Sequence, residues 1–403
     1  MRGRLILYSI LACATIALSV NVSAQRRNVS SNKPLEKESP ISPDVNPRAL
    51  WDGRKSVDFH ALDFPKMVTA QNADFLVDYE YVLGITENGE SRAYPTRYIS
   101  WHHIINDKIG KKEQGGSEYI AITYCIVCNS GIGFSTPVVD KKPLKFDFYG
   151  LYNGVMTMYD TNTGSVWLQV AGRSVKGALL DTNLKRLPLL DTTWGQWKRL
   201  HPDTLVMAPD SRSVASYESK GSVMARGYSS FPAPYFSPTV TRRDTRLPMF
   251  EPVLAVSVPV SQDYAALARN SDTPATRRIL HRAYPQKAFQ GRTGVINDVL
   301  GDTPVAVMYD ATTQTLCAVS RNVGGGRTLT IEARKSPQGR RGFYDKETNS
   351  RWSIEGKAEE GSLKGMELQR IDSHNSQWYG WVSYFPETTI YTRPITPKPS
   401  EKR

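Results

Sequence analysis

Two cysteines separated by two residues, Cys125 and Cys128, have the type and spacing that point most directly to chemistry. They follow a short apolar segment at residues 120–124 that is typical of a β-strand. A Cys-x-x-Cys pair can close a small disulfide ring, can use one thiolate to attack while the other resolves, or can give a soft metal two sulfur ligands. The spacing alone leaves these three uses open.

His102 and His103, which are neighbours in the sequence, could belong to the same site as the two cysteines. A c-type haem needs a histidine directly after the second cysteine, where the chain has Asn129, so this cofactor is excluded. A closed structural zinc site normally has four ligands. We therefore expect either a redox-active thiol pair with oxidoreductase-type activity or an open copper or zinc site. The candidate catalytic residues are Cys125, Cys128 and His102, and the candidate metal ligands are these three together with His103.

A static use of the two thiols is the alternative. In this hypothesis the protein is a non-enzymatic exported binding or scaffold module, and Cys125 and Cys128 form a structural disulfide. A two-residue separation closes so short a loop that the entropic stabilisation is modest. The redox state of the pair separates the two hypotheses, and the sequence specifies neither substrate nor partner.

The chain around these residues repeats itself in order. Arg-Ala-Tyr-Pro at 92–95 recurs unchanged at 282–285, and Ile-Asn-Asp at 105–107 recurs at 296–298. Six collinear matches keep offsets of about 170 to 190 residues, which indicates a tandem duplication. We therefore expect an α+β fold made of two tandem, diverged copies of a largely antiparallel β domain with a few helices.

Only the first copy carries the candidate site. The aligned replacements in the second copy are Asp310 for Cys125, Thr313 for Cys128, Thr293 for His102 and Gly294 for His103. If the first-copy residues served only in packing, apolar replacements would be expected, whereas small and polar ones fit the loss of a site. This joint loss predicts that His102 and the two thiols lie in one pocket.

Local patterns predict the elements around the site. Three features indicate these elements: apolar residues at helical spacing, residues that favour turns, and prolines that end helices. The expected elements are a hairpin at 82–94 with Asn88-Gly89 as its turn, a helix at 96–105, a hairpin at 155–170, and a helix that carries Trp194 and Trp197 and stops at Pro202. Asp107 and Asp160 recur in the copy without thiols, so we expect them to serve turns or caps. Cys317 is expected to be a buried free thiol.

The N-terminal pattern predicts export. Arg2 and Arg4 precede an apolar run at 5–20 and then Val-Ser-Ala at 22–24, as in a cleaved signal peptide. No later apolar stretch reaches the ~20 residues that a membrane-spanning helix needs. We expect a periplasmic or extracellular protein without a transmembrane segment, with lipoprotein anchoring through Cys13 as a minor alternative.

Composition and charge complete the expected organisation. The chain is 40% hydrophobic, which is enough for packed cores, and its net charge of +12 is spread over scattered basic pairs. This favours a solvated basic surface, and no nucleic-acid partner is expected. The expected parts are a signal peptide at 1–24, a flexible leader at 25–49, a first repeat domain at 50–207, a linker at 208–243, a second, degenerate repeat domain at 244–393 and a tail at 394–403.

At the same residues the chain resembles a known family, the exported proteins of the domain of unknown function 3179. The matching segments are 61–66, 101–102, 123–125, Cys128, 158–160, Trp167, 194–197, 201–204, 246–248 and 282–285. Members usually read Tyr-Cys-Pro-Leu-Cys-Gly at the thiol motif, where this chain has Ile126 and Asn129 in place of the proline and the glycine. The resemblance favours His102, which the family motif shares, over His103. It supports the boundaries and the motif and implies no particular activity.

Overall fold

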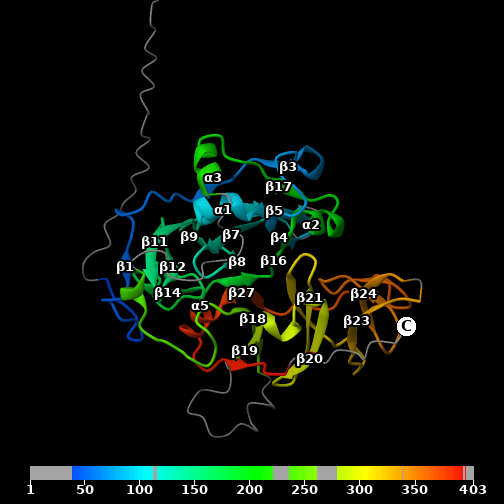
Figure 1. The fold of residues 1–403 in the computed structure, drawn as a ribbon. Helices are drawn as coiled ribbons and strands as arrows, with labels where there is room; N and C mark the ends of the chain where they lie inside the picture. The colour runs from blue at the N-terminus through cyan, green and yellow to red at the C-terminus, as the bar shows by residue number, and fades with distance from the viewer. Residues whose placement is uncertain are drawn as a thin grey trace, which may run out of the picture. The chain divides into compact units, whose positions relative to one another are not determined.

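The structure is a computed structural model that describes residues 39–111, 116–220, 236–260, 279–337, 339–393 and 395. They belong to one compact unit that spans residues 33–403. Strands predominate and the helices are few and short (Figure 1), in agreement with the predicted α+β class. The expected signal peptide and Cys13 lie outside the described residues. Within the described ranges, no helix is both long and apolar enough to cross a bilayer.

The first half of the described chain, up to residue 207, has three five-stranded sheets. The strands of the first sheet, in order across it, are β16 (Leu190–Thr193), β4 (Tyr81–Glu87), β5 (Glu90–Pro95), β17 (Leu205–Met207) and β3 (Met67–Thr69). Those of the second sheet are β15 (Lys185–Leu187), β8 (Ser130–Ser135), β7 (Glu118–Cys125), β6 (Ile104–Ile109) and β2 (Leu62–Asp63). Those of the third sheet are β1 (Trp51–Asp52), β11 (Phe146–Tyr152), β12 (Val155–Asp160), β13 (Val166–Leu168) and β14 (Arg173–Lys176). A small hairpin joins β9 (Val138–Val139) to β10 (Lys142–Pro143). Neighbouring strands are antiparallel except for β17 with β5 and β2 with β6.

The second half has three described sheets with the same kind of hairpin order. Their strands are β27 (Ser373–Gln377), β18 (Pro252–Pro259), β19 (Ile279–Pro285) and β28 (Thr389–Ile390); β20 (Gly294–Leu300), β21 (Thr303–Asp310) and β22 (Thr315–Ser320); and β23 (Ile331–Lys335), β24 (Arg341–Asp345), β25 (Arg351–Trp352) and β26 (Ala358–Glu360). The helical elements of both halves are η1 (Ala70–Asn72), α1 (Thr96–His102), α2 (Trp194–Leu200), α3 (Val214–Lys220), η3 (Ser237–Thr239), η5 (Gln286–Phe289) and α5 (Trp378–Val382).

Both expected hairpins form for the predicted reasons. Asn88 and Gly89 have φ values of 46° and 74° at the β4–β5 turn, a conformation that asparagine and glycine tolerate best. In the β12–β13 hairpin, Asp160 accepts hydrogen bonds from the backbone amide of Thr163 at 2.6 Å and from the indole of Trp167 at 3.0 Å. The prediction that Asp160 serves a turn is confirmed.

The helix expected at 96–105 is shorter than predicted. It ends at His102, and His103 follows with a φ of 61°. Ile104 and Ile105 belong instead to β6, where they pair with Thr123 and Ile122 of β7. Asp107, expected at a turn or cap, lies in the same strand. Helical spacing was a weak signal here because β-branched isoleucines fit a buried strand equally well.

The two halves have corresponding strands and corresponding polar contacts. The sheet β16-β4-β5-β17 has the same order and directions as β27-β18-β19-β28. The shared contacts are Arg92 and Tyr94 donating to Asp107, as Arg282 and Tyr284 donate to Asp298, and Trp197 donating to Thr204, as Trp381 donates to Thr388. Tyr124 and Tyr309 are each the penultimate residue of their strands, β7 and β21.

The halves share packing where they meet. Strand β8 lies against β27, and β16 lies against β22. One buried apolar cluster contains Cys125 and Met156 of the first half together with Trp378 and Trp381 of the second. Trp167, Trp194 and Trp197 are also buried.

Ordered packing extends into the expected leader and linker. Val45 and Ala49, placed in the leader by the sequence, are buried beside Tyr149 and Tyr152 of β11. Within 208–243, α3 packs on α1. The expected tail lies outside the described residues except for Ile395, whose amide donates to the Ala288 carbonyl.

Candidate functional site

The two cysteines lie at a sharp turn between neighbouring strands. Cys125 ends β7 and pairs with Ser130 at the start of β8, so Cys128 occupies the connecting turn. Asn129 has a φ of 50°, and its side-chain oxygen accepts a hydrogen bond from the Tyr124 hydroxyl at 2.7 Å. Asparagine tolerates a positive φ, so it can replace the glycine that members of the resembled family usually have at this position.

Both thiols are buried and free. Cys125 is 2% exposed and Cys128 is fully buried. Burial acts to raise the pKa of Cys125, but hydrogen bonds from the Cys128 thiol and from the backbone amides of Met156, Cys128 and Val127 lower it overall. Burial raises the pKa of Cys128 well above its ordinary value, and the hydrogen bond and charge of Cys125 add to this shift. Cys125 is therefore the thiol that loses its proton first, and Cys128 is the thiol that keeps its proton.

Helix α5 of the second half covers this turn. The amide of Gln377 donates to the Cys128 carbonyl at 2.8 Å, just before the helix begins. A Cβ atom added at Gly380 would lie 2.7 Å from the Cβ of Cys128 and 3.3 Å from its sulfur. Only a glycine fits at this position without displacing the turn.

Two tyrosines lie near the thiols and keep their protons. Burial raises the pKa values of Tyr379 and Tyr384 well above their ordinary values, and the neighbouring cysteines raise them further. The Tyr384 hydroxyl donates to the Tyr152 carbonyl at 2.7 Å. The wall of the site thus carries neutral phenols and no positive charge from these side chains.

Each of the two predicted histidines has a hydrogen-bond partner other than a thiol. The ring nitrogens of His102 lie 2.9 Å from the His60 carbonyl and 2.7 Å from the Tyr217 hydroxyl, so both are occupied. Burial lowers the pKa of His102, which keeps the ring neutral. His103 Nδ1 lies 3.2 Å from the Tyr124 carbonyl.

The structure brings the two cysteines together, whereas the ring nitrogens of His102 pair with the His60 carbonyl and the Tyr217 hydroxyl. In the described part of the chain, no group of three or more His, Cys, Asp or Glu side chains is placed to hold a metal ion. Cys125, Cys128, His102 and His103 therefore do not form a preassembled ligand set. Helix α1 ends at His102, and the ring of this residue contacts Tyr217 of α3. A common pocket for His102 and the two thiols stays a prediction.

The sequence also gave little sign of a second polar cluster, formed by Ser91, His201 and Glu355. The separations along the chain are 110 residues between Ser91 and His201 and 154 residues between His201 and Glu355. No spacing rule links positions so far apart. The one available signal is His201, which lies in the segment at 201–204 that carries the family resemblance.

Residues 58–388 match the family described as protein of unknown function (DUF3179). The chain belongs to this family. The predicted resemblance is thereby confirmed, and the match spans both halves, including the thiol turn and the helix that covers it. No curated protein and no solved structure matches the chain.

Proposed function

We propose that the protein is an exported thiol redox protein in which Cys125 and Cys128 interconvert between a dithiol and a disulfide. The observation that carries the proposal is the placement of two free thiols at one turn, where they are hydrogen-bonded to each other and to backbone amides. A lowered pKa provides the attacking thiolate, and a protonated neighbour provides the resolving thiol.

The reaction uses a small-molecule disulfide as oxidant. The Cys125 thiolate attacks one sulfur of that disulfide, breaks its S–S bond and releases one thiolate. Cys128 then loses its proton to the released thiolate and attacks the Cys125 sulfur, which frees the second half of the oxidant. One protein thiolate and one protein thiol are oxidised to a disulfide, and the small disulfide is reduced to one thiol and one thiolate.

Burial restricts the partner to small molecules or to a state in which α5 moves. Both cysteines are buried in one cluster with the aromatic residues of α5, and Gly380 of this helix lies against Cys128. A protein substrate could not reach Cys125 without displacing this helix. The same burial favours the alternative, a binding or scaffold module in which the thiols serve only in packing or in a static disulfide.

A redox titration in glutathione buffers distinguishes these functions. We expect reversible formation of the Cys125–Cys128 bond, followed by mass spectrometry, and its loss in Cys125→Ser and Cys128→Ser. Cys317→Ser is the matched control, because burial raises the pKa of this thiol to about 11 and it has no neighbouring cysteine among the described residues. A folded protein whose thiols never oxidise, or whose disulfide resists millimolar glutathione, would contradict the redox function. Copper or zinc bound in stoichiometric amount and lost in the double variant would instead support the metal hypothesis.

We also propose that the two halves arose by tandem duplication and that residues 1–24 direct export to the periplasm or beyond. The matching strand order and the paired contacts of Asp107 and Asp298 support the duplication. Sequencing the N-terminus of the protein recovered from culture tests export, with Gln25 expected as the first residue.

A further inference from the structure

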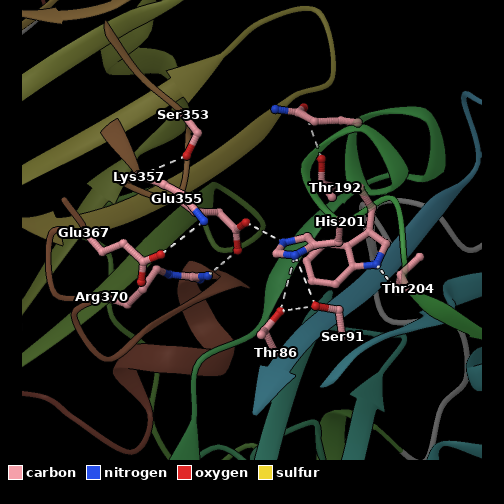
Figure 2. Close-up of polar contacts among 12 residues, drawn as sticks. Thr86, Ser91, Thr192, His201, Thr204, Ser353, Glu355, Lys357, Glu367 and Arg370 are labelled. Carbon is pink, nitrogen blue, oxygen red and sulfur yellow. Dashed lines mark hydrogen bonds and ion pairs between the residues drawn. The ribbon is translucent and has the colours of Figure 1, made fainter. Parts of the chain in front are cut away.

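We propose that Ser91, His201 and Glu355 form a second active site, a serine nucleophile with a histidine base and an orienting carboxylate, that hydrolyses small acyl esters. Figure 2 shows His201 with Glu355 on one side and Ser91 and Thr86 on the other. His201 Nδ1 lies 3.1 Å from Ser91 Oγ, and His201 Nε2 lies 2.6 Å from Glu355 Oε2. These distances match the nucleophile–base–carboxylate pattern.

The Glu355 carboxylate is ionised and hydrogen-bonded to the His201 imidazole. Burial acts to raise the pKa of Glu355, but the hydrogen bond to His201 and the charge of Arg370 lower it overall. Arg370 Nη1 donates to the other carboxylate oxygen at 3.0 Å. Glu355 therefore accepts from Nε2–H of His201, and this tautomer leaves Nδ1 free to accept the Ser91 proton.

The imidazole and the hydroxyl are both fixed in place. The His201 ring lies on Trp197 with a centroid separation of 4.0 Å, and the Trp197 indole is anchored to Thr204 at 2.9 Å. Thr86 pairs with Ser91 across the β4–β5 hairpin, and their hydroxyl oxygens are 2.7 Å apart. Thr86 can thus donate to Ser91 Oγ while Ser91 donates to His201.

An open cleft lies beside these groups. It has a volume of about 440 Å³, and its lining includes Gly89, Ser91, Lys111, His201 and Asp203. The volume suits a short acyl ester rather than a polymer or a long lipid chain. Ser91 and His201 both face this space, so a bound carbonyl carbon could reach the hydroxyl.

The reaction balances with water as the only co-reactant. Ser91 Oγ attacks the ester carbonyl carbon and passes its proton to His201 Nδ1, and His201 returns that proton to the departing alcohol. Water then attacks the acyl-serine, gives one proton to His201 and releases the carboxylic acid. His201 finally returns its proton to Ser91 Oγ.

The second half provides a natural comparison. Ser257 and His281 occupy the strand positions that correspond to Thr86 and Ser91, and their side chains are 2.8 Å apart. There Phe385 packs on Trp381 as His201 packs on Trp197. Burial and the charge of Arg186 lower the pKa of His281 to about 4. Among the described residues no carboxylate is hydrogen-bonded to His281, whereas Glu355 is hydrogen-bonded to His201 in the proposed site.

Covalent labelling tests the proposal on the full chain. With a fluorophosphonate probe we expect the modified peptide to contain Ser91, and with p-nitrophenyl acetate we expect hydrolysis that Ser91→Ala removes. His201→Gln and Glu355→Gln should lower the rate by about 10²-fold or more, the range of general-base contributions. Ser257→Ala is the control and should leave both readouts unchanged. Labelling of the wild-type chain does not depend on how well any variant folds.

Two results would overturn the proposal. One is a folded wild-type protein in which Ser91 is never labelled while a reference serine esterase is. The other is hydrolysis that survives in Ser91→Ala at the wild-type rate. Labelling at Ser257 in place of Ser91 would contradict the role assigned to Glu355.

Discussion

The β7–β8 turn of the first half and the β21–β22 turn of the second are built alike but covered differently. Asn129 and Gln314 hold matching positions with φ values of 50° and 54°. Gly380 of α5 lies against Cys128 in one turn, whereas Gln196 of α2 accepts a hydrogen bond from Thr315 at 3.2 Å in the other. Each helix covers the turn of the opposite half.

This difference separates framework from chemistry. The strands, the indole contacts and the Arg–Asp pairs occur in both halves, so they belong to the framework. The β7–β8 turn, called the thiol turn below, differs in its two cysteines and in the residue that covers it. Gly380 of α5 leaves room for the sulfur of Cys128 and adds no polar group. The other turn fills the same place with hydroxyl and amide contacts, which stabilise a turn but carry no redox chemistry.

Removing the matching indoles is the strongest challenge to the comparison. Trp197→Ala and Trp381→Ala should each lower the free energy of unfolding by about 3–5 kcal/mol, because each deletes a fully buried side chain and its bond to a threonine. Urea unfolding gives both values. Only Trp381→Ala should also speed alkylation of Cys125, since Trp381 shares the thiol cluster and Trp197 does not. Equal alkylation in the two variants would contradict the assignment of α5 as the cover.

Acid should destabilise the second half through His281. Burial, with Arg186, lowers the folded-state pKa of His281 to about 4, below the ordinary 6.5. Between these values the unfolded chain binds the proton and the folded chain does not, so stability is complete above pH 6.5 and is lost as pH falls toward 4. The loss should reach roughly 3 kcal/mol for this one group. Urea unfolding at several pH values should show a flatter dependence for His281→Gln, and an unchanged dependence would refute the assignment.

The sequence predicted the framework better than its boundaries. The hairpin at 82–94, the helix carrying Trp194 and Trp197, and the fold class follow from local turn, capping and periodicity signals. The helix expected at 96–105 was too long because Ile104 and Ile105 suit strand and helix equally, and only pairing with β7 decides between them. Packing of residues 39–49 depends on contacts with distant strands, so polar composition suggested a leader there.

The sites were predicted in part because local spacing is visible and long-range contact is not. The Cys125–Cys128 pair could be named from its motif. Gly380, which packs on Cys128, and Tyr217, which hydrogen-bonds to His102, each lie more than 100 residues along the chain from the residue they contact. Ser91, His201 and Glu355 meet for the same reason, so no local pattern could have joined them.

Exchanging the covering residues should sharpen the comparison of the two turns. Gly380→Gln places a side chain where even a Cβ would lie 2.7 Å from Cys128, and we expect a loss of about 1–3 kcal/mol from overpacking. The reverse change, Gln196→Gly, removes hydrogen bonds to Thr192 and Thr315 without a clash. Thermal unfolding of both should show the larger loss for Gly380→Gln, and the opposite order would mean that the thiol turn has room to relax.

The smallest expected effect comes from the residues with positive φ at the two turns. Gln314→Gly should stabilise the protein by up to about 1 kcal/mol, because a residue with a Cβ is disfavoured at a φ of 54° and glycine is not. Asn129→Gly should give no such gain. Asparagine tolerates this conformation, and the change also removes the acceptor for the Tyr124 hydroxyl, a hydrogen bond with a net contribution of about 0.5–1.5 kcal/mol. Denaturant unfolding of the two variants under one buffer condition measures the difference. Equal gains at both turns would show that the Tyr124–Asn129 contact contributes nothing to the stability of the thiol turn.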